Sequence, residues 1–238
     1  MEIQNRIKTF YRSLDPYAVD VYDNLDYYSE VIRKQAESLN TEEKYSVFGM
    51  ISEETAKYLL RVYTTQFPGF IIDNLIFQYD KGKTTEIDIL FLTPNQLYVI
   101  ESKHRSQNII VNSDGTLNIG GRVEDPISQN IGHIRKLLKS TTYGYLVPMD
   151  RITSIIYFTL NKCRVNNPIT IFKKGDIVGA FANSRNLLSL LHQIELSKPN
   201  GKIPYQRLGE ELLDLGKNFR GEEGRLKHIN NLKALRKG

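Results

Sequence analysis

Two short apolar runs separated by a Pro-Asn pair constrain the fold of this chain more than any other feature. Residues 85–93 and 96–103 are rich in Ile, Leu, Val, Tyr and Phe, and Pro94-Asn95 lies between them. Apolar runs of this length on either side of a turn signal are typical of a β-hairpin. We therefore expect the two runs to form neighbouring antiparallel strands.

The hairpin places three charged residues close together. A loop of two or four residues centred on Pro94-Asn95 brings Asp88 opposite Glu101, whereas a three-residue loop shifts the pairing. Lys103 shares a strand face with Glu101 because side chains alternate. Facing carboxylates, about 5 Å apart at Cβ, repel each other unless a cation lies between them. A divalent metal would remove this repulsion, and carboxylate oxygens suit Mg²⁺ or Mn²⁺. The alternative is an ordinary strand end that reaches solvent, where Glu and Lys are common.

Composition places the chain among globular proteins. It has 238 residues, of which 40% are hydrophobic and 25% charged, enough for one sizeable domain and a smaller element. It has no apolar run of about 18 residues and no secretion signal, so we expect no membrane span and a cytoplasmic location. Cys163, the single cysteine, cannot form an internal disulfide, which fits a reducing compartment. We interpret it as a structural or incidental thiol.

Positive charge is concentrated at the C-terminal end. Residues 216–238 contain seven Lys or Arg and two Glu residues, a net charge equal to the +5 of the whole chain. Such a tail could bind a phosphate backbone. A solvated helix with basic residues near its C-terminus explains the pattern equally well.

The N-terminal 45 residues predict a helical extension. Apolar residues recur at intervals of three and four between residues 10 and 39, which indicates one long amphipathic helix whose main part begins near Asp15-Pro16. The helix could pack on the domain, pair with a second helix or mediate a dimer.

A second helix is predicted to begin with N-cap residues at 40–43, to be interrupted at Gly49 and to continue to Gln66. Glu53 lies on its apolar stripe, and Glu54 points elsewhere. Burial of an unpaired carboxylate is costly, so Glu53 serves either as a first-turn charge near the helix dipole or as a residue of a metal cleft.

The remaining segments complete an α/β chain with a mixed sheet and helices on both faces. The near-continuous apolar run at 151–160 predicts a strand covered on both faces. Further elements are predicted as a strand at 70–79, a short strand pair or loop at 109–119, a helix at 125–140, a strand at 176–181, a helix at 183–196, a linker at 198–202 and a basic helical tail.

Asp88 followed by Glu101-Ser102-Lys103 resembles the motif of the PD-(D/E)XK nucleases, and more narrowly that of their nuclease-related domain (NERD). Asp125-Pro126-Ile127-Ser128-Gln129 is similar to the family's Asp/Asn-Pro-x-x-Gln helix start. A tryptophan usual after the Lys strand is missing. The resemblance implies a restriction-endonuclease-like fold over residues 46–197, with the extension 1–45 before it and the linker and tail 198–238 after it.

The resemblance also implies Mg²⁺- or Mn²⁺-dependent hydrolysis of phosphodiester bonds. Asp88 and Glu101, with the backbone carbonyl of Ser102, would hold the metal, and Lys103 would position a water or neutralise the transition state. Glu53, rather than Glu54, would reach the metal through water or tune Lys103.

Two residues of the predicted helix at 125–140 are candidates for contacts with the substrate. Gln129 would orient the nucleic-acid backbone or the water. His133, one turn further on, could contact phosphate or simply face solvent. His104 lies on the opposite strand face from Lys103, and we assign it no role.

Three hypotheses follow from the sequence. The first is a nuclease that acts on DNA rather than RNA. The second is a nuclease-like domain with weak or no cleavage that serves as a nucleic-acid-binding or protein-interaction module. The third is an interaction protein whose function lies in the N-terminal helix.

Overall fold

The computed structural model describes residues 2–17, 25, 30–32, 34, 36–104, 109–112, 114–159, 165–166, 171–200 and 202–235. The helices are α1 (Glu2–Ser13), α3 (Thr41–Thr64), α4 (Pro126–Lys139), α5 (Leu187–Ser197), α6 (Tyr205–Leu215) and α7 (Gly221–Leu235), with short 3₁₀ turns η1 (Tyr143–Leu146), η2 (Met149–Arg151) and η3 (Lys217–Phe219). The strands are β1 (Phe70–Asp80), β2 (Lys83–Leu92), β3 (Leu97–Lys103), β4 (Ile109–Val111), β5 (Leu117–Ile119), β6 (Arg122–Glu124), β7 (Ile152–Phe158), β8 (Val165–Asn166), β9 (Ile171–Lys174) and β10 (Ile177–Asn183).

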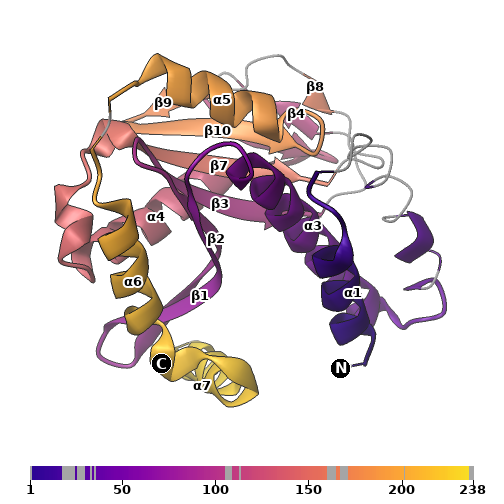
Figure 1. Cartoon of the computed structure of the whole chain (residues 1–238). Coiled ribbons are helices and arrows are strands. Elements are labelled where there is room, and N and C mark those ends of the chain that lie inside the picture. Colours follow the sequence, from indigo (N-terminus) through magenta and orange to yellow (C-terminus); the bar gives the residue numbers. More distant parts are fainter. Residues whose placement is uncertain are drawn as a thin grey trace.

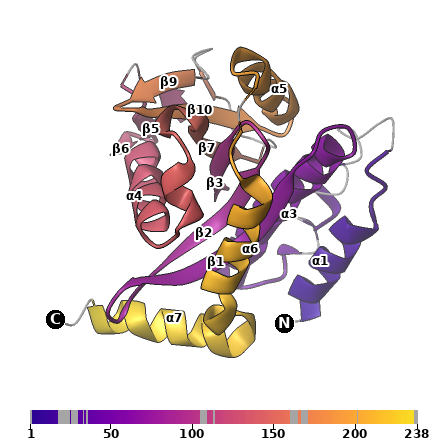
Figure 2. The ribbon, with the colours of Figure 1, turned by 60° about the vertical axis from the view of Figure 1, so that its left-hand side comes forward.

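A six-stranded mixed sheet forms the centre of the molecule, in the order β1-β2-β3-β7-β10-β9 (Figure 1). Helices cover both of its faces, with α3 and α4 on opposite sides (Figure 2). A smaller sheet has the order β6-β5-β4-β8. The predicted α/β class, with a mixed sheet flanked by helices, is therefore confirmed.

The β2–β3 hairpin has the predicted register. Ile89 pairs with Ile100, Leu90 with Val99 and Leu92 with Leu97. The N–H of Thr93 donates to the carbonyl of Gln96 at 2.9 Å and closes the turn. Alternate residues enter the two cores on either side of the sheet, so a shift of one residue would exchange every buried side chain between them.

The strand predicted at 151–160 is the centre of the sheet. Every residue of β7 is buried, and β7 is parallel to β3 on one side and to β10 on the other. Parallel neighbours and helices on both faces leave no solvated side, which explains the near-continuous apolar run. The sequence did not predict β6, β8 or β9, which have two to four residues each.

Helix α3 begins as predicted and is not interrupted at Gly49. The Asn40 side chain accepts the N–H of Glu43 at 3.0 Å, and the Glu43 carboxylate accepts the N–H of Asn40 at 3.2 Å, which forms a capping box. The helix is continuous from Thr41 to Thr64. The prediction of a break was wrong because a glycine inside a helix costs only about 1 kcal/mol. Burial of the apolar stripe outweighs that cost.

The prediction of one continuous helix over 10–39 was wrong at residues 14–17, although the described residues 25, 30–32, 34 and 36 are helical. Helix α1 spans Glu2–Ser13 and ends before Asp15, whose carboxylate accepts the N–H of Tyr17 at 2.8 Å. Pro16 disfavours helical backbone at Asp15, and the turn that Asp15 caps replaces the next helical hydrogen bond. Residues 18–24, 26–29, 33 and 35, which the prediction also covered, lie outside the described residues.

The C-terminal half follows the predicted order. Helix α4 begins at Pro126 behind the N-cap Asp125, as predicted, whereas α5 begins at Leu187 because Asn183 accepts the N–H groups of Arg185 and Asn186 in a preceding turn. The basic tail is helical, and its last helix, α7, packs on β2. Cys163 lies outside the described residues. No helix in the described part of the chain combines the length and apolar character needed to cross a bilayer.

Candidate active site

Asp88 lies where the β1–β2 ladder is interrupted. Asp73 pairs with Ile89 and Leu75 with Ile87, but Asn74, which stands across from Asp88, has a left-handed backbone with φ of 50°. The side-chain alternation changes at this point, since Ile87 and Leu90 enter the same core. The irregular backbone leaves the Asp88 carboxylate free to accept the N–H of Ser102 at 2.8 Å.

Glu101 and Lys103 lie next to each other on β3. Lys103 Nζ is 2.6 Å from Glu101 Oε1, and both side chains are largely withdrawn from solvent. One oxygen of Glu101 is thus used by Lys103, just as one oxygen of Asp88 is used by Ser102. The second oxygen of each carboxylate has no hydrogen-bond partner among the described residues.

Helix α3 approaches the end of the hairpin through a serine pair. Ser102 Oγ donates to Ser52 Oγ at 2.6 Å, and Glu53 follows in the helix. Burial raises the pKa of Glu53 to about 6; Lys57 opposes this shift and Glu86 adds to it. The structure therefore brings Glu53 toward the acidic residues of β2.

Asp88 has the most perturbed carboxyl of this group. Burial and, next in size, the neighbouring carboxylate of Glu101 raise its pKa to about 8, against the lowering effect of the hydrogen bond from Ser102. Glu53 and Glu86 also raise the pKa of Asp88. Like charges that are held together in this way favour either a proton or a cation.

Glu54 belongs to a different cluster, although it is adjacent to Glu53 in sequence. Its carboxylate is 2.6 Å from Lys57 Nζ, which is also 2.8 Å from Asp73. Burial lowers the pKa of Lys57, but Asp73 and Glu54 outweigh that effect and raise it. Glu54 is therefore ion-paired within the fold, and Glu53 is the carboxylate of this helix that raises the pKa of Asp88.

Glu86 is an acidic neighbour that the sequence analysis did not assign to the site. It lies two residues before Asp88 on β2, and the spacing of two along a strand was the available signal. Its Oε2 is 3.7 Å from Nε2 of the buried His228, whose Nδ1 lies 2.7 Å from Thr84 Oγ1. Helix α7 thus contacts the strand that carries Asp88, and no local sequence pattern predicts that contact.

Helix α4 contributes His133. Burial lowers the pKa of His133, and the Glu101 carboxylate opposes that shift, so the ring lies beside Glu101 and is neutral near pH 7. Its Nδ1 is buried without a hydrogen-bond partner among the described residues. Gln129, one turn earlier, is exposed, and its side chain makes no hydrogen bond to the residues above within the described part of the chain. Its role remains a prediction.

The donor set fits a hard divalent cation. Within the described residues there is no group of three or more His, Cys, Asp or Glu side chains arranged as a complete metal site. Mg²⁺ does not need one, because it commonly keeps several waters and uses one or two carboxylates together with substrate phosphates. Asp88 and Glu101 each offer an oxygen without a partner, and a cation between them would relieve the repulsion that raises the pKa of Asp88.

Comparison with known proteins relates one segment of the chain to a protein family. Residues 48–159 match the family model of the nuclease-related domain, NERD. That segment contains α3 from residue 48 onward, the β1–β2–β3 hairpins, α4 and β7, and with them every site residue discussed above except those of α7. Neither the search of curated proteins nor the search of solved structures gave a match. The chain therefore carries a nuclease-related domain over residues 48–159.

Proposed function

We propose that this chain hydrolyses phosphodiester bonds of nucleic acid, with DNA as the preferred substrate, in a reaction that requires Mg²⁺ or Mn²⁺. The observation that carries the proposal is the pair of under-neutralised carboxylates Asp88 and Glu101, with Lys103 beside them, inside a nuclease-related domain. A divalent cation at this position would polarise the scissile phosphate and lower the pKa of an attacking water.

Residues of β2 and β3 would bind the cation and stabilise the developing negative charge. Asp88 and Glu101 would hold the cation, together with the backbone carbonyl of Ser102. Lys103, which already lies 2.6 Å from Glu101, would donate to the attacking water or to a phosphate oxygen as negative charge develops.

Glu53, His133 and Gln129 would act around that centre. A carboxyl with a pKa of about 6 can exchange a proton near neutral pH, so Glu53 would orient the water and accept its proton. The neutral His133 would hydrogen-bond to a phosphate oxygen or to that water. Gln129, exposed at the start of α4, would contact the nucleic-acid backbone.

Cleavage assays test this proposal directly. The purified full chain is incubated with plasmid, linear and single-stranded DNA and with RNA, in Mg²⁺, Mn²⁺ or EDTA. We expect cleavage in either metal, none in EDTA, and none by Asp88→Ala or Lys103→Ala. The exposed pair Asp80 and Lys83 in the β1–β2 turn supplies the controls Asp80→Ala and Lys83→Ala, which should cleave like the wild type.

Two results would contradict the proposal. Cleavage that survives both Asp88→Ala and Lys103→Ala would rule out this site. Metal-independent binding without cleavage by the wild type would instead favour a nucleic-acid-binding module.

A further inference from the structure

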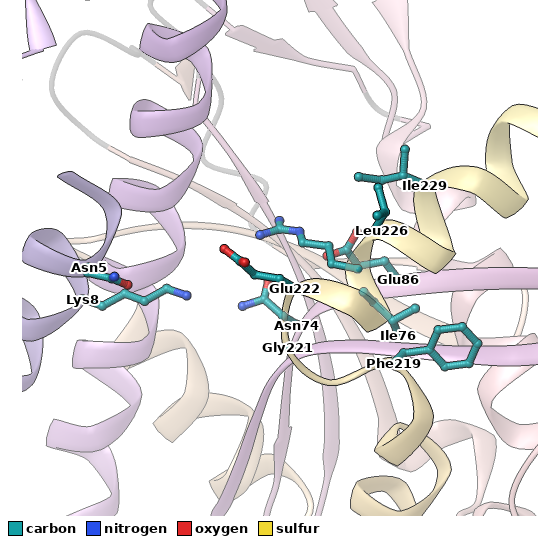
Figure 3. Close-up of a pocket in the computed structure, with 11 residues that line it drawn as sticks. Asn5, Lys8, Asn74, Ile76, Glu86, Phe219, Gly221, Glu222, Leu226 and Ile229 are labelled. Atoms are coloured by element: carbon teal, nitrogen blue, oxygen red, sulfur yellow. The ribbon is translucent and has the colours of Figure 1, made fainter. Parts of the chain in front are cut away.

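A groove lies between the two terminal helices, beside the candidate active site. Its cavity has a volume of about 580 Å³ (Figure 3). Asn5 and Lys8 of α1 line one wall, and Glu222 and Leu226 of α7 line the other, with strands β1 and β2 between them. Both walls come from outside the segment that matches the nuclease-related domain.

The floor of the groove is continuous with the carboxylate cluster. Asn74 lines the groove and stands across from Asp88 in the interrupted β1–β2 ladder. Glu86 also lines the groove, and its carboxylate acts on both Asp88 and Glu53. A polymer that lies in the groove would therefore contact Asn74 and Glu86, which are neighbours of Asp88.

Two cations, one from each wall, line the groove and form no ion pair with any residue that the structure describes. Lys8 and Arg225 act on carboxylates only through space, since Lys8 lowers the pKa of Asp73 and Arg225 opposes the rise in the pKa of Glu53. Arg225 does not pair with Glu222, although the two are three residues apart on α7, a spacing that permits such a pair. Their charges are available to an anionic ligand that spans the groove, for which a phosphodiester backbone has the right repeating charge.

The size and the apolar lining of the groove favour a single strand. A volume of about 580 Å³ accommodates one or a few nucleotides, whereas a duplex carries two backbones separated by grooves of about 12 and 6 Å. Leu226 and Ile229 on the α7 wall are 58% and 39% exposed, and they give the bases an apolar surface.

We propose that the groove between α1 and α7 binds one strand of nucleic acid, DNA or RNA, through Lys8 and Arg225 and guides it to Asp88. This inference rests on the proposed function, because it identifies the substrate's path to the same site. It assigns the terminal helices to substrate binding, and it predicts a preference for single-stranded over double-stranded substrate.

Binding measured without cleavage tests the inference. Fluorescence anisotropy of labelled oligo(dT), oligo(U) and a short DNA duplex is recorded in EDTA, at several salt concentrations, with the full chain. We expect the double variant Lys8→Gln/Arg225→Gln to bind both single strands about tenfold more weakly. The slope of log Kd against log salt should fall by about 0.7 for each lost phosphate contact.

A matched control variant, and a variant that is expected to strengthen binding, make the test specific. Arg207 and Lys233 are exposed and do not line the groove, so Arg207→Gln/Lys233→Gln removes the same charge and should leave binding nearly unchanged. Glu222→Gln removes a negative charge from the groove and should strengthen binding. All variants are checked for an unchanged melting temperature, because the substituted side chains, apart from that of Lys8, are exposed.

Binding and cleavage data separate the two proposals. Equal weakening by groove and control variants, tighter binding of duplex than of single strands, or no binding by the wild type would overturn the groove assignment. Cleavage abolished by Asp88→Ala, with binding unaffected by Lys8→Gln/Arg225→Gln, would leave the hydrolytic site standing and reject the groove. Binding that is weakened by Lys8→Gln/Arg225→Gln, together with no cleavage by the wild type, would support the groove and reject the hydrolytic site.

Discussion

Two carboxylate clusters lie side by side in this molecule and differ in how their charge is balanced. The paired cluster consists of Glu54, Lys57 and Asp73, in which one lysine lies within 2.8 Å of both acids. Although burial raises the pKa of Asp73, Lys57 outweighs that effect and lowers it. The paired cluster is therefore neutralised by the chain's own residues.

The open cluster consists of Glu53, Glu86, Asp88 and Glu101. Lys103 is close to one of them, Glu101, and the pKa of Asp88 is raised to about 8 by burial and by its acidic neighbours. Each cluster contains a buried carboxylate, Glu54 in the paired cluster and Glu101 in the open one, and the shortage of positive charge distinguishes the open one. That shortage, rather than the number of acids, is the reason why we propose the open cluster as the cation site.

Removal of the lysine from each cluster should separate stability from activity, and this is the largest effect that we predict. Lys57→Ala leaves the buried Glu54 without its partner and should cost about 3–5 kcal/mol of unfolding free energy, measured by urea denaturation. Lys103→Ala also removes the partner of a buried carboxylate, Glu101, so it should lower stability in the absence of metal, and it should abolish cleavage as well. Cleavage that survives in folded Lys103→Ala would contradict the assignment of the open cluster as functional.

Divalent cations should stabilise the protein through the open cluster alone. At a concentration about 100 times Kd, Mg²⁺ or Mn²⁺ should add about 2.7 kcal/mol to the unfolding free energy, seen as a higher melting temperature. Asp88→Asn should abolish that increase, whereas Asp73→Asn should retain it. Equal stabilisation of both variants would place the cation elsewhere.

The two clusters should respond oppositely to pH in the absence of metal. Asp88 keeps its proton in the folded state up to about pH 8, whereas the unfolded chain loses it near pH 4, so the folded state binds more protons in between. Stability should therefore fall by up to roughly 4 kcal/mol as pH rises from about 5 to 8, and Asp88→Asn should flatten the decline. Asp73, whose pKa is lowered, stabilises the fold above its unfolded pKa and loses that contribution in acid. A decline that persists in Asp88→Asn would reject this explanation.

Substitution of His133 should have the smallest effect. Loss of one hydrogen bond to the phosphate should lower kcat/KM about tenfold in His133→Gln, measured at fixed Mg²⁺. His192, which contacts Phe67 on the other face of the sheet, supplies the control His192→Gln, which should cleave normally. An unchanged kcat/KM in His133→Gln would show that His133 has a structural role and no role in cleavage.

The parts of the fold that depend on local sequence were predictable. Turn chemistry and strand alternation determine the hairpin register around Pro94-Asn95, and the register brings Asp88 and Glu101 together. The N-caps Asn40 and Asp125 mark two helix starts by the same local chemistry. Helical spacing also separated Glu53 from Glu54, although the distinction had physical meaning only once Lys57 was located.

Contacts between distant segments were not predictable in the same way. The contact of α7 with β2, through His228 and Glu86, joins residues far apart in sequence and carries no local signal. The orientation of His133 depends on the rotation of α4 against the sheet, which periodicity does not determine. The end of α1 at Asp15-Pro16 was visible in the sequence, but the apolar stripe continued through it and favoured a single helix.

Mn²⁺ binding to the full chain, followed by electron paramagnetic resonance, tests the central claim most directly. The claim is that the open cluster needs a metal ion to balance its negative charge. The paired cluster needs none, because Lys57 balances its charge. The wild type and Asp73→Asn should bind Mn²⁺ with the same affinity, and Asp88→Asn and Glu101→Gln should each bind about tenfold more weakly or not at all. Binding that is unaffected by Asp88→Asn and Glu101→Gln, or no binding by the wild type, would contradict it.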